Sequence, residues 1–174
     1  MKNMKNPLKM FISYSHNDED YVREFKKHLI TLKRKNIVND WYDRELITGD
    51  NFDAEIKKNL LNADLVVFLV SVDFLNSWYC FDVELKETLN RLNNGEVRII
   101  PVIVRRCKWE DTELAKYQIA TKNGKPISEY ENDDTAWVEV INSIEKAAEK
   151  HSNILIAIAI AIAIAIAIAI AIRN

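Results

Sequence analysis

The sequence is short of the residues that build metal centres and glycine-rich nucleotide loops. Its two cysteines, Cys80 and Cys107, lie outside any CxxC spacing, which excludes the usual zinc layouts and favours a reducing compartment. The three histidines form no HExxH pair, and the three glycines form no GxGxxG turn between a strand and a helix. We therefore expect no metal and no bound cofactor, and a hydride-transferring dehydrogenase is disfavoured.

An excess of charge of one sign is also missing. The formal net charge is -2 and the sequence pI is about 6.0, so we expect no nucleic-acid partner held by phosphate contacts. The basic run 33–35 ends a predicted helix, where cations complement the helix dipole. Residues 1–9 are polar and basic with no apolar stretch, so we expect no secretory signal peptide.

The C-terminal end is different, because every residue from Ile154 to Ile172 is apolar and most follow an Ile-Ala alternation. The chain therefore divides into a globular domain, residues 1–150, and a low-complexity segment, residues 151–174. As a helix the apolar stretch would span about 28 Å, close to the roughly 30 Å hydrocarbon core of a bilayer. We favour a membrane helix with the domain in the cytoplasm. Cross-β stacking of the isoleucines and a repeat expansion without function are the alternatives.

In the globular part, strand-like apolar runs alternate with helical patterns. Strands are predicted at 10–14, 37–42, 65–70 and 97–104, with a possible short edge strand near Ile127, and helices at 17–32, 52–60, 74–92 and 137–148. This alternation predicts an α/β fold, a flavodoxin-like parallel sheet of four to five strands in the order 2-1-3-4-5 with helices on both faces. In that order a crevice opens between the carboxyl ends of strands 1 and 3.

The predicted third helix carries an acid on a particular stripe. On a wheel of 100° per residue, Ser77, Cys80 and Glu84 fall together, beside the apolar face that must enter the core. They would border the crevice without being sealed in the core. Glu84 is then either a surface salt-bridge residue or a carboxylate placed for chemistry. On this reading its replacement by glutamine would change stability by no more than about 0.5 kcal/mol.

Three segments carry a resemblance to a known family: "MFISYSHNDEDYV", "WYDRELITGDNFDAEIKKNLLNADLVVFLVSVDFLNSWYC" and "RIIPVIVRRCKW". Through them the chain resembles a bacterial Toll/interleukin-1-receptor (TIR) domain over roughly residues 8–150. Many TIR domains of this kind cleave NAD⁺, whereas others only assemble signalling complexes. The resemblance implies that NAD⁺ is a substrate rather than a cofactor, and that other TIR domains are partners through self-association that completes the pocket.

The resemblance also implies roles for individual residues. Glu84 matches the catalytic glutamate of the cleaving members. The positions that match or adjoin the substrate site are Tyr14, Ser15, His16, Trp41, Asp43, Gly49, Phe52, Ser77 and Cys80. Alternatives stay open for several of them: packing for Trp41, Phe52 and Cys80, a loop cap for Asp43, and a solvated loop position for His16.

The chemistry implied by the resemblance needs few groups. Loss of neutral nicotinamide builds an oxocarbenium-like charge on the ribose, as in glycoside hydrolysis. One fixed carboxylate stabilises that charge, and no acid is needed for the leaving group. The products would be nicotinamide and linear or cyclic ADP-ribose, in antiphage defence or signalling. The alternative is a non-catalytic TIR scaffold. A response-regulator receiver is rejected, because strand 3 ends in Val70-Ser71-Val72 without a phosphorylatable aspartate.

Overall fold

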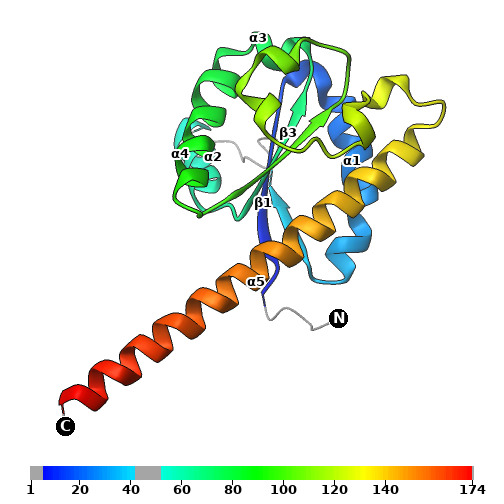
Figure 1. The fold of residues 1–174 in the computed structure, drawn as a ribbon. Helices are drawn as coiled ribbons and strands as arrows, with labels where there is room; N and C mark the ends of the chain where they lie inside the picture. Colours follow the sequence, from blue (N-terminus) through cyan, green and yellow to red (C-terminus); the bar gives the residue numbers. More distant parts are fainter. Residues whose placement is uncertain (1–5, 42–51, 174) are drawn as a thin grey trace.

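A four-stranded parallel sheet forms the centre of the molecule (Figure 1). The structure is a computed structural model and describes residues 6–41 and 52–173. The strands are β1 (Leu8–Tyr14), β2 (Val38–Trp41), β3 (Leu65–Val70) and β4 (Arg98–Ile103), in the order β2-β1-β3-β4. All three strand pairs are parallel, and Met10 of β1 lies opposite Asp40 of β2 and Leu65 of β3. The predicted α/β class and the order of the first four strands are confirmed.

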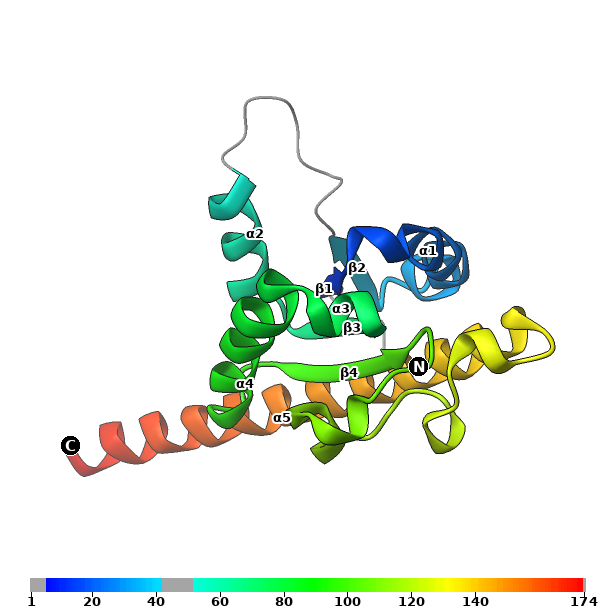
Figure 2. The ribbon, with the colours of Figure 1, turned by 90° about the horizontal axis from the view of Figure 1, so that it is seen from above.

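Helices cover both faces of this sheet (Figure 2). One face carries α1 (Glu19–Arg34) and the first part of α5 (Asp133–Arg173). The other carries α2 (Phe52–Leu61), α3 (Val72–Asn76), a π-helical segment η3 (Trp78–Leu85) and α4 (Lys86–Asn93). Side chains alternate along a strand, so β1 sends Met10 and Ile12 toward α1 and α5 and sends Phe11 toward α2 and η3.

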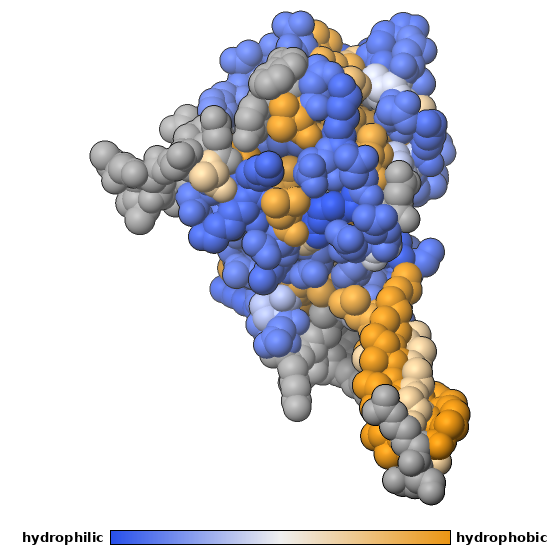
Figure 3. Space-filling view, turned by 90° about the vertical axis from the view of Figure 1, so that its left-hand side faces the viewer, coloured by the Kyte–Doolittle hydropathy of each residue, from blue (hydrophilic) through white to orange (hydrophobic). Residues whose placement is uncertain are grey.

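The last helix is one unbroken element of 41 residues with two different environments. Its first part is buried against the sheet from Ala136 to Ala148 at the positions that face inward. Beyond Asn153 it leaves the domain, and the isoleucines become exposed, from 39% at Ile154 to 80% at Ile172 (Figure 3). The apolar segment therefore continues the domain's own helix, and it is long and apolar enough to cross a membrane.

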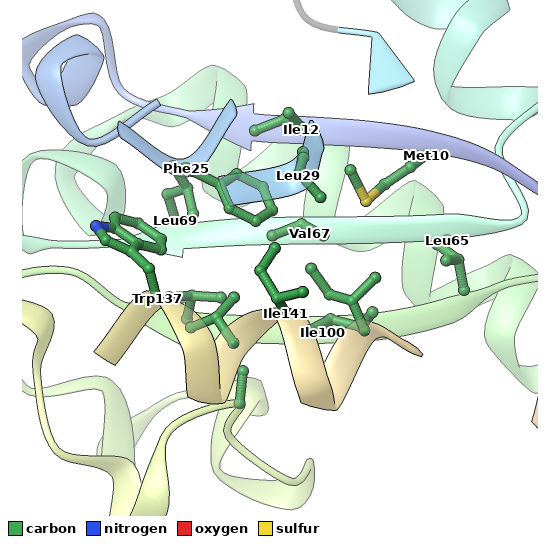
Figure 4. Close-up of a cluster of buried hydrophobic side chains, with 14 of the residues drawn as sticks. Met10, Ile12, Phe25, Leu29, Leu65, Val67, Leu69, Ile100, Trp137 and Ile141 are labelled. Atoms are coloured by element: carbon green, nitrogen blue, oxygen red, sulfur yellow. The ribbon is translucent and has the colours of Figure 1, made fainter. Parts of the chain in front are cut away.

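The core on the α1 and α5 face consists mainly of apolar side chains (Figure 4). Phe25 of α1 and Trp137 of α5 stack there, with ring centroids 5.5 Å apart and ring planes 23° apart. Val67 and Leu69 of β3 pack beneath them. Each Å² of apolar surface that these side chains bury contributes about 25 cal/mol, and this burial holds α5 to the sheet.

The outer side of β4 is covered by irregular backbone rather than by a fifth strand. Residues Ile127–Glu129 form a short 3₁₀ turn, η7, so the possible edge strand near Ile127 was a wrong prediction. Single hydrogen bonds from Ala120 N to Pro101 O (2.9 Å) and from Ser128 N to Val104 O (3.1 Å) cover that edge instead. Because the carbonyl of Pro101 points outward, its missing N–H also falls on the outer side, where the proline interrupts no pairing with β3.

The predicted continuous helix over 74–92 is divided into three parts. Ser71 caps α3 by accepting from Phe74 N (3.0 Å), and Ser77 caps η3 by accepting from Cys80 N (3.3 Å). Ser77 itself has extended backbone angles, φ -80 and ψ 112, which end α3. Serine competes for backbone donors in this way and so favours helix starts. Because η3 is π-helical, a wheel of 100° per residue does not describe Trp78–Leu85.

Candidate functional site

A cavity of about 320 Å³ opens at the carboxyl end of β1, between that strand, α2 and η3. Its polar lining comes from the end of β1, the following loop, and η3 with its capping residue Ser77. The lining residues are Phe11, Ile12, Ser13, Tyr14, Ser15, His16, Asn17, Ile56, Ser77, Cys80 and Glu84. Six of the residues singled out from the sequence therefore meet at one cavity: Tyr14, Ser15, His16, Ser77, Cys80 and Glu84.

Glu84 is the carboxylate of this cavity and is only 5% exposed. The hydroxyl of Ser13, itself 2% exposed, donates to Glu84 Oε2 across 71 residues of sequence. Thr88 Oγ1 donates to the Glu84 backbone carbonyl at 2.7 Å. The carboxylate is thus fixed in one position at the cavity wall. The helical wheel placed Glu84 outside the core, whereas it is buried. The expectation that Glu84→Gln would barely change stability therefore rested on a wrong assumption about its exposure.

Ser13 is the residue that the sequence interpretation missed. It shares a face of β1 with Phe11, which packs in the core under α2 and η3. A hydroxyl at an alternating position that otherwise needs an apolar side chain must find a buried partner, because an unpaired buried polar group is costly. That break in the alternation was the available signal, and Glu84 is the partner.

Cys80 and Tyr14 are bound to one another. The Cys80 thiol donates to the Tyr14 backbone carbonyl at 3.2 Å, and Cys80 is 7% exposed. The Tyr14 side chain packs with the apolar cluster on the α1 and α5 face, so its carbonyl rather than its ring is tied to η3. This contact joins the end of β1 to η3.

The loop after β1 forms the outer rim. Ser15 caps the short 3₁₀ turn η1 (His16–Asp18) by accepting from Asn17 N at 3.4 Å. His16 is exposed, and its ring lies 5.8 Å from the Tyr14 ring at 45°. Both residues are positioned by the backbone of a capped turn, which makes the rim a fixed edge beside Glu84.

Four predicted site residues cannot be placed at the cavity. Asp43 and Gly49 lie outside the described residues. Trp41 ends β2 and Phe52 begins α2, but the described structure does not extend to their side chains. Their assigned roles remain predictions.

A charged network closes the same edge of the sheet behind the rim. Asp18, 1% exposed, accepts from Ser71 Oγ and from Arg105 Nε (2.9 Å) and Nη2 (2.7 Å). Arg105 also donates to Asp73, whose other oxygen accepts from Asn17 Nδ2 at 3.0 Å. The hydrogen bond from Arg105 holds the pKa of Asp73 below its ordinary value. The network ties together the loops after β1, β3 and β4.

Two further observations bear on what this edge can bind. A larger hollow of about 830 Å³ lies between α3 and the loop after β4, but its acids, Glu110 and Glu129, come from that outer loop rather than from the sheet. Across residues 6–41 and 52–173, no group of three or more His, Cys, Asp or Glu side chains is arranged to hold a metal ion. The smaller cavity with its buried carboxylate is therefore the candidate site.

Comparison with known proteins agrees with the fold. A family model described as "TIR domain" matches residues 10–138. The uncharacterized protein y4lF of Sinorhizobium fredii is 34% identical over 139 residues, which cover 80% of this chain and 43% of that protein. The chain thus spans less than half the length of this relative.

The TIR domain of the Toll-related receptor TRR-2 from Hydra magnipapillata aligns with a TM-score of 0.55 and 20% identity, over 78% of this chain and 96% of that domain. This likeness concerns the fold alone. Because the family model covers most of the described domain and the same sheet is present, the chain belongs to the TIR domain family.

Proposed function

We propose that this TIR domain cleaves NAD⁺ between nicotinamide and ribose. The single observation that carries the proposal is the buried carboxylate of Glu84, fixed by Ser13 at the wall of the cavity. A carboxylate is ordinarily among the least buried groups of a protein unless it has a partner and a role.

The proposed chemistry uses that carboxylate as a fixed negative charge. As the bond to nicotinamide breaks, positive charge grows on the ribose, and Glu84 stabilises it without reorganising. Nicotinamide leaves as a neutral molecule, so the site needs no acid beside it. Water then completes hydrolysis to ADP-ribose, or the adenine ring closes the cyclic product.

The size of the cavity bears on how substrate is held. About 320 Å³ is at the lower end of the range for ligand sites, which is roughly 300–1,000 Å³. It suits the nicotinamide ribose half of the dinucleotide better than the whole molecule. We propose that the remainder extends over the rim of Ser15 and His16, and that a neighbouring TIR domain completes that side on self-association.

The test is nicotinamide release from NAD⁺ by the full chain, measured dilute and after forced clustering. Glu84→Gln removes the charge but keeps the size, and we expect a rate loss of about 10²–10³-fold. Glu87→Gln is the matched control, since Glu87 lies on α4 and does not line the cavity. If Glu84→Gln cleaves as fast as the parent, Glu84 is not catalytic. If neither protein cleaves NAD⁺ even when clustered, the non-catalytic scaffold function is favoured.

We also propose that residues 154–172 span a membrane and hold residues 1–150 in the cytoplasm, where NAD⁺ consumption would serve antiphage defence or signalling. The support is the exposed apolar helix, whose most apolar 18-residue window has a mean hydropathy of 3.3 and is 0% buried against the domain. Flotation of the full chain with vesicles tests this. Recovery in the soluble fraction without detergent would count against the membrane span and favour the functionless alternative, whereas a pellet that does not float would favour cross-β stacking.

A further inference from the structure

A third hollow, which shares no lining residue with the cavity of Glu84, lies where α5 leaves the domain. It has a volume of about 550 Å³ and is formed by β4, the irregular segment after it and one face of α5. Ser143, Lys146 and Lys150 share that face, because side chains three or four residues apart on a helix are neighbours. The next position of the same face, Ile154, begins the apolar segment.

The lining of this groove is cationic and contains no acid. Arg98 of β4, Lys122 of the irregular segment, and Lys146 and Lys150 of α5 come from three separate parts of the chain. No aspartate or glutamate is among the residues that line it. Glu145, the nearest acid in sequence to Lys146, turns away and pairs with Lys35 at 3.0 Å.

These cations are also short of partners. In the part of the chain that the structure describes, no ion pair involves Arg98, Lys146 or Lys150. The Nε of Arg98 is buried there without a hydrogen-bond partner. Lys122 is less available, because its charge also acts on Glu139 and helps to hold the pKa of that carboxyl below its ordinary value. The groove therefore presents positive charges and an unpartnered guanidinium nitrogen with no acid in its lining, which is the chemistry of an anion site.

The distance of these charges from the apolar segment fits one source of acceptor. At 1.5 Å per residue, Lys150 lies about 6 Å and Lys146 about 12 Å before Ile154 along the helix axis. The headgroup layer on one side of a bilayer is about 5–8 Å deep, and charges act through water over about 8 Å. If the apolar segment crosses a membrane, the groove stands at the level of the lipid phosphates.

We propose that the groove of Arg98, Lys146 and Lys150 binds the phosphate of anionic lipid headgroups, so that the domain docks on the membrane surface in one orientation. The proposal rests on the membrane span proposed above. A lipid phosphate supplies acceptor oxygens for the lysines and for the accessible part of the Arg98 side chain. The acyl chains of the same lipid would contact the apolar segment. Each lysine near an anionic surface contributes an attraction equal to about a fivefold change in binding.

The experiment uses the full chain reconstituted in phosphatidylcholine vesicles with and without phosphatidylglycerol. Flotation first reports insertion. Electron spin resonance of spin-labelled lipids then gives the association constant of phosphatidylglycerol relative to phosphatidylcholine. Lys146→Gln with Lys150→Gln should lower this preference by about fivefold for each charge removed. Lys27→Gln with Lys57→Gln removes the same charge from exposed positions on α1 and α2 and should leave the preference unchanged.

Arg98→Gln separates a folded groove from a simple row of lysines beside a membrane helix. Arg98 lies in β4, far from the apolar segment in sequence, so its loss lowers the preference only if the groove itself holds the lipid. A chain that does not float overturns the span and the headgroup site together. A chain that floats with no preference for phosphatidylglycerol, or whose preference Arg98→Gln and the lysine pair leave intact, overturns the headgroup site alone. Loss of the preference on adding inorganic phosphate at constant ionic strength would reassign the groove to a soluble anion.

Discussion

The two faces of the sheet are built from the same strands, but one packs as an apolar core and the other contains the cavity of Glu84. Toward α1 and α5, the inward positions of β1 and β3 are apolar and pack around Phe25 and Trp137. Toward α2 and η3, the same alternation places Ser13 where an apolar side chain would complete the core, and Glu84 accepts a hydrogen bond from its hydroxyl. One polar residue at an alternating position has opened a site in what is otherwise a second core. The first face therefore governs stability, and the second is where we expect activity to be decided.

The largest effect should come from the closed face. Trp137 is 1% exposed, and Trp137→Ala leaves a cavity beneath α5, so we expect the free energy of unfolding to fall by about 3–5 kcal/mol. Denaturant titration measures this. Nicotinamide release per folded molecule should stay unchanged, with Trp137→Phe as a milder control that keeps the ring stack. A fall in activity per folded molecule would break the separation of the two faces.

A smaller effect on stability, with a change in rate, should follow on the open face. Ser13→Ala leaves the buried oxygen of Glu84 without its donor, at a cost of about 1–3 kcal/mol in unfolding free energy. A carboxylate that is no longer held should also slow nicotinamide release by about 10–100-fold. Ser15→Ala, on the rim, is the matched control and should alter neither quantity strongly. Equal rates for Ser13→Ala and the parent would remove Ser13 from the mechanism.

The smallest effect is a pH dependence on the closed face, at His151. Burial lowers the pKa of His151, nearby Arg98 lowers it further, and Asp64 opposes both. Because the folded pKa is below the unfolded value near 6.5, its contribution to stability is complete above about pH 6.5 and is lost as pH falls through the folded value. Urea unfolding at a series of pH values, compared with His151→Gln, should show a weaker acid dependence in the variant. Parallel curves would place the acid sensitivity elsewhere.

The sequence was sufficient for much of this organisation, for identifiable reasons. A short apolar run such as Leu65–Val70 is typical of a strand buried on both faces, and the alternation of such runs with helices favours parallel order. The cavity beside β1 follows from that order. What local pattern could not supply were contacts between distant residues, above all Ser13 with Glu84 and Asp18 with Arg105.

Two errors have a common origin in assuming regular geometry. The wheel treated 74–92 as one α-helix, whereas the extended backbone of Ser77 and the π-helical turn after it rotate Glu84 further into the protein. The apolar residues around Ile127 were read as a strand edge, yet Ile127 enters the core from a 3₁₀ turn. At both places the segment packs against the core, but its backbone conformation differs from the regular helix or strand that the sequence pattern predicted.

The continuity of α5 has a mechanical consequence. The part of α5 that packs on the sheet and the apolar part form one continuous helix. A rotation of one part about the helix axis is therefore transmitted to the other. Each residue turns the helix by about 100° and advances it by about 1.5 Å. Inserting one alanine near Asn153 would therefore rotate the sheet and its cavity by about 100° around the axis of α5, relative to the apolar part of the helix. In two neighbouring copies whose α5 helices run parallel, the number of residues between the domain and the apolar segment would then decide whether the two cavities face each other or point apart.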